Sequence, residues 1–210
     1  TESAGFRQGY GPYSQDVLLP AFIAAYTGKS AQEVKLNPFK QRPLPNWRVT
    51  YNGLGRIKFL ENIVKNVNIT HGYNSNFTLS GYITDLNYEG SGYLSPSVID
   101  TLSNNFNPLF AIPQVVISEQ FSPLIGVDIT WANDITTRFD YKKSRSLSMS
   151  FIDYRLSETN TTEVTFSFGY RLKGLKLPFK FRGKKISLNN DLNFNFEFSF
   201  RDNVTTNYIL

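Results

Sequence analysis

The C-terminal half of the chain alternates between apolar and polar side chains with a period of two residues. Over residues 192–201 the sequence reads LNFNFEFSFR, so that an apolar side chain stands at every second position from Leu192 to Phe200. Residues 164–172 (VTFSFGYRL) repeat this pattern. Successive side chains of a β-strand point to opposite faces of a sheet, so each segment is predicted to be a strand with one apolar and one polar face.

In two neighbouring segments the apolar residues are predicted to fall on the same face of the sheet. The apolar residues are Ile125, Val127, Ile129 and Trp131 before a predicted turn at residues 132–134, and Ile135, Phe139 and Tyr141 after it. A three-residue loop places Trp131 opposite Ile135 and Asp128 opposite Arg138, which is an attractive cross-strand pair. A register slipped by two residues would set Asp128 against Asp140, so we expect the first register.

Further turns are expected where polar residues gather, at residues 143–145, 157–162, 173–186 and 202–203. The turn at 143–145 would set Tyr141 opposite Leu147. The alternation breaks at Phe151–Ile152, which indicates either a bulge or the point where the strand leaves the apolar zone. The pattern predicts an antiparallel meander of strands about ten residues long, the length that crosses a bilayer at a tilt.

The N-terminal half is less regular. Trp47, Val49 and Tyr51 alternate with polar residues and predict a short strand, and residues 67–83 predict one long strand. A Gly-, Ser-, Asn- and Pro-rich stretch at about 85–113 predicts a long loop. Residues 1–46 are expected to be mostly irregular, in the lumen or at the rim of a barrel, whereas residues 47–210 form wall strands. Within 1–46, Ser14 is expected to cap a short helix that includes Ala21–Tyr26 and ends near Gly28.

The residue inventory argues against an enzyme. The chain has no cysteine and one histidine, His71, which removes disulfides and thiolate metal sites. We expect a structural role for His71 and predict no catalytic residue, no metal and no cofactor. The net charge of +5 indicates no particular partner. The aromatic residues form an alternating face instead of a base-stacking platform, so no nucleic-acid partner is predicted.

Half-buried strands occur both in soluble β-sandwiches and in membrane barrels. Large Phe, Tyr, Leu and Ile side chains dominate the apolar rows, and the opposite face is too polar for a second packed layer. This favours transmembrane strands of an outer-membrane β-barrel. No segment approaches the roughly 20 apolar residues of a membrane helix. The first residues lack a signal-peptide layout, so either a signal was removed or the chain is an internal piece.

The alternation assigns each predicted strand residue to a face. The residues predicted to face lipid are Ile125, Val127, Ile129, Trp131, Phe139, Tyr141, Val164, Phe166, Phe168, Tyr170, Phe194, Phe196, Phe198 and Phe200. The residues predicted to face a water-filled lumen are Asp128, Arg138, Asp140, Arg171, Asn193, Asn195, Glu197 and Arg201.

Two basic clusters are expected in turns at the same end of the strands. The first contains Lys142, Lys143 and Arg145, and the second extends from Lys173 to Lys185 and includes Lys184. Solvated turn charges are one interpretation. The other is contact with lipopolysaccharide phosphates at the outer leaflet, because the longer loops of these barrels usually lie outside.

Several long segments resemble one known family. They are DVLLPAFIAAYTGKS at residues 16–30, LPNWRVTYNGL at 44–54, SEQFSPLIGVDITW at 118–131 and TTRFDYKKSRSLSMS at 136–150. They are similar to the late portion of the SprA/Sov family, the giant outer-membrane translocon of the Bacteroidota type IX secretion system. The similarity extends from about Asp16 to the end of the chain.

The resemblance implies a segment of a very large single-chain barrel in the bacterial outer membrane. Such a barrel exports folded cargo proteins from the periplasm and is gated by plug and shuttle partner proteins. The remaining partners would be the rest of the barrel chain, outer-membrane lipid and lipopolysaccharide. The alternatives are a different outer-membrane barrel, such as a porin or nutrient transporter, and a secreted β-sandwich binding module.

Overall fold

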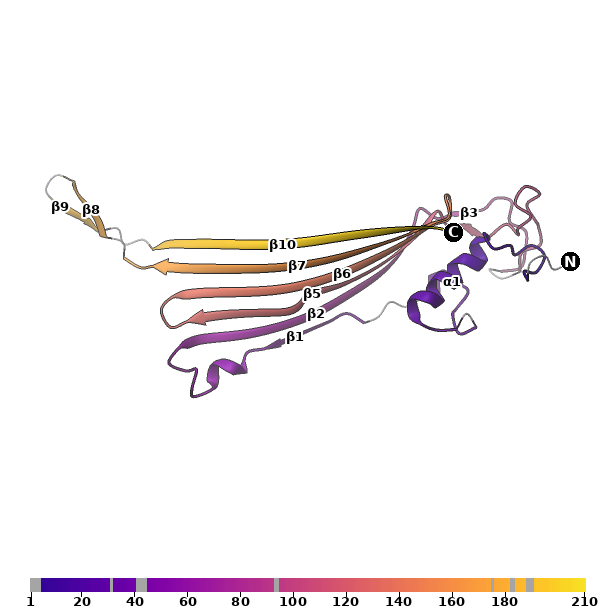
Figure 1. The fold of residues 1–210 in the computed structure, drawn as a ribbon. Coiled ribbons are helices and arrows are strands. Elements are labelled where there is room, and N and C mark those ends of the chain that lie inside the picture. Colours follow the sequence, from indigo (N-terminus) through magenta and orange to yellow (C-terminus); the bar gives the residue numbers. More distant parts are fainter. Residues whose placement is uncertain are drawn as a thin grey trace.

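A six-stranded antiparallel sheet dominates the computed structural model (Figure 1), which describes residues 5–30, 32–40, 45–92, 95–174, 176–181, 184–187 and 191–210. Its strands follow one another in chain order, as in a meander. They are β1 (Trp47–Tyr51), β2 (Val64–Ser80), β5 (Gln114–Trp131), β6 (Ile135–Ser150), β7 (Arg155–Leu172) and β10 (Leu192–Ile209). The predicted all-β antiparallel meander is therefore confirmed. The described sheet is open, with β1 and β10 at its edges.

Short elements decorate the connections between these strands. The β2–β5 connection contains the two-stranded pair β3 (Ile83–Thr84) and β4 (Phe110–Ala111), and the β7–β10 connection contains β8 (Lys176–Phe181) and β9 (Lys184–Ser187). Helix α1 covers Gln15–Thr27, and two 3₁₀ turns, η1 and η2, cover Pro38–Lys40 and Gly53–Arg56. The long connection predicted at about 85–113 matches the segment that separates β3 from β4.

The register predicted for the first hairpin is confirmed. Asp128 of β5 lies opposite Arg138 of β6, and Val127 lies opposite Phe139. The intervening turn uses Asp134 with a φ of 61°, a left-handed conformation that a short polar side chain tolerates. Lys65 and Lys173 both contact the Asp134 carboxylate, at 2.8 and 2.7 Å. The two lysines lower the pKa of Asp134 to about 2, with Lys173 the larger cause.

Three predicted turns and the predicted strand length were wrong. Residues 143–145 lie inside β6, residues 157–162 inside β7 and residues 202–203 inside β10, so these strands contain 16 to 18 residues. Tyr141 therefore does not oppose Leu147; it pairs with Val164. The hairpin turn lies instead at residues 151–154, where the alternation breaks. Polar residues extend the strands here because they hydrogen-bond across them, as Thr159 does with Thr205 at 3.0 Å.

A bulge in β5 interrupts its pairing with both neighbouring strands, β2 and β6. Phe121 pairs with Lys143 and Ile125 with Tyr141, so residues 122–124 of β5 oppose only Lys142. The bulge turns the carbonyl of Leu124 toward His71, whose Nδ1 lies 2.7 Å from that oxygen. Because β5 gains two residues relative to β6, its odd-numbered side chains stay on the same face through the bulge. His71 thus makes the structural contact that its isolation in the sequence suggested.

The two ends of the sheet differ. We refer to the end with the β5–β6 turn as the Asp134 end and to the opposite end, with the turn at 151–154, as the α1 end. Figure 1 shows α1, the loop around β3 and the C-terminus at the α1 end, and β8 and β9 at the Asp134 end. The predicted short helix is α1. Ser14 stands at its N-cap position but makes no side-chain capping hydrogen bond, and Gly28 follows in the left-handed conformation that ends helices.

Helix α1 forms the principal core of the chain with one face of the sheet. Leu19 and Ile23 of the helix are buried in one cluster with Val115 of β5 and Met149 of β6. Burying such side chains contributes roughly 1.5–3 kcal/mol each, which offsets part of the conformational entropy lost in ordering a helix of 13 residues. This core occupies only the α1 end. Elsewhere on that face Val67 of β2 is also buried, at 6% exposed, where η2 contacts β2, whereas Ile125, Phe139 and Phe166 of β5, β6 and β7 are 51%, 39% and 47% exposed.

Candidate functional site

The strand registers place all the apolar rows on a single face of the sheet, which we call the apolar face. One row across five strands consists of Ile69, Val127, Phe139, Phe166 and Phe198, each paired with the next. The ladders from β6 through β7 to β10 show no register shift, so every second residue of these strands lies on this face. All the residues predicted to face lipid lie on it.

The part of this face nearer to the Asp134 end is exposed. Phe196, Phe198 and Phe200 of β10 are 66%, 71% and 63% exposed. Exposed apolar surface of this extent marks contact with a membrane, a ligand or another protein. We call this part the apolar band; it runs from the Asp134 end to the row that contains Tyr73 of β2 and Phe121 of β5.

Aromatic side chains stand at both limits of the apolar band. Trp131 and Tyr170 lie near the Asp134 end. At the other limit Trp47 stacks on Tyr73 with ring centroids 4.3 Å apart, and Tyr73 lies 5.0 Å from Phe121. Eight residue steps of β6 separate the two limits, from Ile135 to Lys143, which is ~27 Å along the strand.

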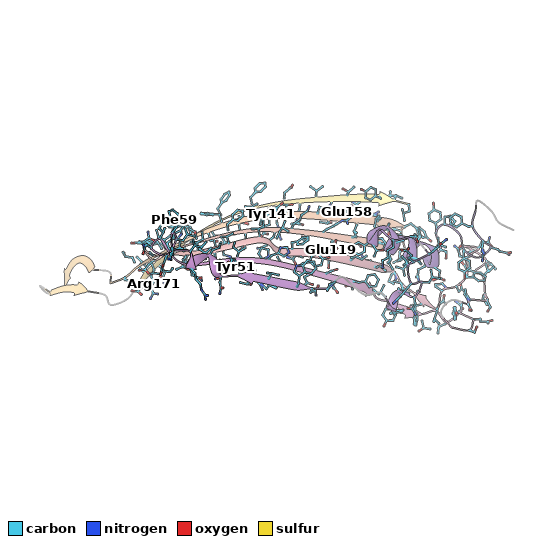
Figure 2. All side chains as sticks on the ribbon, turned by 90° about the horizontal axis from the view of Figure 1, so that it is seen from below. Tyr51, Phe59, Glu119, Tyr141, Glu158 and Arg171 are labelled. Carbon is cyan, nitrogen blue, oxygen red and sulfur yellow. The ribbon has the colours of Figure 1, made fainter. Side chains whose placement is uncertain are left out.

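Charged residues follow the apolar band toward α1. We call them, with their polar neighbours, the charged belt: Glu119, Lys143, Arg145, Asn160, Thr162 and Asp202. Arg145 donates to Glu158 of β7 at 2.7 Å, and Glu119 accepts hydrogen bonds from Tyr73 of β2 and Tyr26 of α1, both at 2.7 Å. Figure 2 shows the order along the sheet, with Arg171 at the Asp134 end, then Tyr141, and then Glu119 and Glu158.

The opposite, polar face carries a network of ion pairs. Arg138 lies 2.7 Å from Asp140 and 3.5 Å from Asp128. Glu163 lies 2.7 Å from Lys142 and 3.2 Å from Arg201. All residues predicted to face the lumen lie on this face: Asp128, Arg138, Asp140, Arg171, Asn193, Asn195, Glu197 and Arg201.

Two members of this network, Lys142 and Glu163, were not predicted from the sequence. Lys142 was expected in a turn, and the strand of residues 164–172 was expected to begin one position after Glu163. Extending the alternation of that strand by one residue would have placed Glu163 on the polar face.

The predicted lipopolysaccharide site is not one cluster. Because residues 142–145 form strand and not turn, their side chains alternate: Lys142 joins the polar face, whereas Lys143 and Arg145 lie on the apolar face. The side chains of Lys184 and Lys185 fall outside the described part of the chain. Their strand β9 lies at the Asp134 end, while Lys143 lies mid-sheet, so the prediction that both clusters share one end is wrong.

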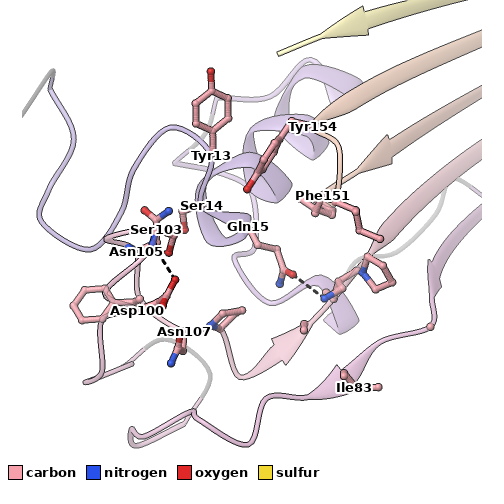
Figure 3. A pocket seen from close by; sticks show the side chains of 17 residues that line it. Tyr13, Ser14, Gln15, Ile83, Asp100, Ser103, Asn105, Asn107, Phe151 and Tyr154 are labelled. Atoms are coloured by element: carbon pink, nitrogen blue, oxygen red, sulfur yellow. Dashed lines mark hydrogen bonds between the residues drawn. The ribbon is translucent and has the colours of Figure 1, made fainter.

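A cavity of about 440 Å³ opens at the α1 end, between the start of α1, the β2–β5 connection and the turn at 151–154 (Figure 3). Polar side chains that line it, such as Gln15 and Asp100, hydrogen-bond with backbone groups. Gln15 bridges the β2–β5 connection, donating to the Phe110 carbonyl at 2.8 Å and accepting from the Ile112 amide at 2.7 Å. Asp100 accepts from the Ser103 amide at 3.0 Å. This arrangement ties the connection to the helix and offers no acid–base pair for catalysis among the lining residues.

The helix carries one half-buried acid next to Gln15, a residue that lines the cavity. Asp16 lies in the first turn of α1, and burial raises its pKa to about 6. Among the described residues no group of three or more His, Cys, Asp or Glu side chains is placed to hold a metal ion. No helix in the described ranges is both long and apolar enough to span a membrane. No protein-family model matches the chain, and no match is found among curated proteins.

Proposed function

We propose that this chain is a wall segment of an outer-membrane β-barrel, with the apolar face toward lipid and the polar face toward a water-filled interior. The observation that carries the proposal is the separation of the two faces across five neighbouring strands. One face presents exposed phenylalanines, and the other presents ion pairs such as Arg138–Asp140. A barrel wall between lipid and water requires this division.

A soluble β-sandwich explains the exposed apolar band less well. In a sandwich one face of each sheet contacts water and the other contacts a second sheet. The apolar band would then need an apolar partner layer of about the same size. Among the described residues the apolar band carries exposed side chains such as Ile125, Phe139 and Phe198, and the core formed with α1 lies beyond the charged belt.

The free edge of β10 supports a larger closed sheet. β10 pairs with β7 over 18 residues, and its other edge has no strand partner in the described sheet. Unpaired backbone groups cost several kcal/mol each in hydrocarbon, so transmembrane sheets close into barrels. The same reasoning applies to the edge at β1. We therefore infer that further strands complete the wall.

The specific barrel we propose is the protein-conducting translocon of the type IX secretion system in the bacterial outer membrane. The support is the resemblance of four long segments to the SprA/Sov family. The function would be conduction and gating for folded cargo, together with plug and shuttle proteins, and not catalysis. In this orientation α1 lies on the outside of the wall, because it packs on the apolar face, and not in the lumen.

The test is the size and location of the native chain. An antibody raised against residues 192–210 would be used to blot denatured fractions of cells. A band of very high mass in the outer membrane is the expected result. A soluble or secreted band near 24.0 kDa would overturn the membrane assignment. Accumulation of cargo in the periplasm after gene deletion would separate a translocon from a porin or nutrient transporter.

A further inference from the structure

The sheet is longer than a bilayer is thick. β5, β7 and β10 contain 18 residues each, which extend over about 60 Å at a rise of ~3.4 Å per residue. A barrel strand crosses the hydrocarbon with about 9–11 residues. Under the proposed function, a large part of each strand therefore lies outside the hydrocarbon, and the residues on the apolar face indicate which part.

The apolar face changes character at one row of paired residues. This border row consists of Tyr73, Phe121, Lys143, Thr162 and Asp202, each paired with the next. On its Asp134 side lie the phenylalanines of the apolar band. On its α1 side the next row contains Glu119 and Arg145. The aromatic pair Trp47–Tyr73 stands at the border, where rings with an apolar body and a polar edge prefer to lie.

Apolar residues return beyond the charged belt, and on β5 and β6 they have a protein cover, whereas Val204 and Tyr208 of β10 are 53% and 48% exposed. Val115, Ile117, Leu147 and Met149 are buried beneath α1. The apolar face thus has two apolar regions separated by charges. On β5 and β6 the region beyond the belt is covered by α1, as apolar surface in water requires. On β6, β7 and β10 the apolar band is exposed, and it spans nine residues of β6, from Ile135 to Lys143, within the number with which a tilted barrel strand crosses the hydrocarbon.

We propose that the border row lies at the membrane surface and that the Lys143 ammonium contacts the phosphates of anionic lipid headgroups. Three cations lie close together in β6, and two of them have partners: Lys142 pairs with Glu163 on the polar face, and Arg145 pairs with Glu158. Lys143 is exposed on the apolar face, and among the described residues it has no ion pair. It is the cation that remains for a ligand outside the wall.

This inference rests on the proposed function and adds the position of the membrane surface along the strands. The part of the wall between the border row and the turn at 151–154 stands in water, and α1 lies against its outer surface just above the lipid. Helix α1 then separates lipid from the apolar side chains of Val115 and Met149.

Depth measurements in lipid test the position of the border. The 210 residues contain no cysteine, so single cysteines can be placed on a cysteine-free form of the native full-length protein. Phe198→Cys, Asp202→Cys and Thr206→Cys lie on the same face of β10, each ~13 Å from the next along the strand. Each would carry a fluorophore, with quenchers attached to lipid at the bilayer centre or at the headgroup. Ser199→Cys on the polar face is the matched control.

We expect the bilayer-centre quencher to act at position 198, the headgroup quencher alone to act at 202, and neither to act at 206 or 199. Quenching of position 206, or quenching of 202 from the bilayer centre, would overturn the border while leaving the membrane assignment intact. Absence of quenching at 198 would overturn the proposed function itself.

The lipid contact of Lys143 has its own matched pair of variants. A fluorophore at Thr162→Cys, which pairs with Lys143, would compare quenching by brominated phosphatidylglycerol and brominated phosphatidylcholine. One lysine near the surface supports an enrichment of the anionic lipid of about fivefold. Lys143→Gln is expected to abolish it and Lys142→Gln to retain it. Equal enrichment in both variants would show that Lys143 does not contact the headgroup phosphate.

Discussion

An arginine placed at Phe196 is expected to destabilise the protein strongly in a membrane. Phe196 pairs with Phe168 on the apolar face and is 66% exposed in the sheet, so most of its side chain would contact lipid and little would contact protein. It lies four residues from Leu192 at one end of the apolar band and six from Asp202 at the border row, or about 13 and 20 Å along the strand. This is near the middle of the hydrocarbon.

The expected cost follows from that depth. A charged side chain on the lipid face of a barrel costs about 2–4 kcal/mol at the midplane and about 0–1 kcal/mol near an interface. Phe196→Arg should therefore lower the free energy of unfolding by about 2–4 kcal/mol, and Leu192→Arg by about 0–1 kcal/mol. Asn195→Arg is the control, because Asn195 lies on the polar face in a groove with Asp128 and Glu197. Its effect should stay within about 0.5 kcal/mol.

The assay is reversible denaturant unfolding of the native full-length protein in lipid vesicles. Equal costs for Phe196→Arg and Asn195→Arg would contradict the proposed orientation, since the two faces would then not differ in their surroundings. A cost of Leu192→Arg as large as that of Phe196→Arg would contradict it as well. Such a result would indicate a protein interface, whose cost does not depend on depth in a bilayer.

Three further variants probe other parts of the structure. Leu19 is 1% exposed in the core, so Leu19→Ala should weaken the docking of α1 by about 2–5 kcal/mol and raise hydrogen exchange in α1 but not in β10. Ala25→Ser, on the exposed helix surface, is the control and should leave hydrogen exchange in α1 unchanged. Gly126→Ala would bring a Cβ atom to 2.6 Å from Pro123 Cγ and 2.8 Å from Asp140 Oδ1, and should lower the free energy of unfolding by about 1–3 kcal/mol; Gly55→Ala, whose nearest neighbour is 3.6 Å away, is the control. The pKa of Asp16 is raised to about 6, so the folded state holds its proton more tightly than the unfolded state does. The docking of α1 should therefore be most stable below about pH 4 and weaken as the pH rises to about 6; Asp16→Asn should remove this dependence in hydrogen exchange, and Glu33→Gln should keep it.

The local patterns in the sequence were sufficient for strand identity and facing. Residues 192–200 and 164–172 alternate without interruption, and a two-residue period has one structural meaning wherever one face is apolar. The Asp128–Arg138 register also followed, because a three-residue turn and opposite charges restrict the hairpin to one pairing. The helix after Ser14 was predictable because capping residues mark its two ends.

Strand length and turn position were not predictable from the same patterns. The run from Lys142 to Ser146 and the run from Ser157 to Thr162 contain residues that are common in turns, and their alternation carries no apolar signal. Ion pairs such as Arg145–Glu158 hold these segments extended, and their partners lie on neighbouring strands. Such pairing across the sheet cannot be seen in one segment of sequence.

Side-chain alternation is a property of each strand, so the meander with one apolar and one polar face follows from the sequence alone. Where along the strands the apolar face is exposed, charged or covered depends on tertiary contacts. That division depends on α1, which packs against β5 and β6 from about one hundred residues away in the chain, and on the registers that align Tyr73, Phe121 and Lys143 in one row. Contacts over such separations arise only when the whole sheet has assembled.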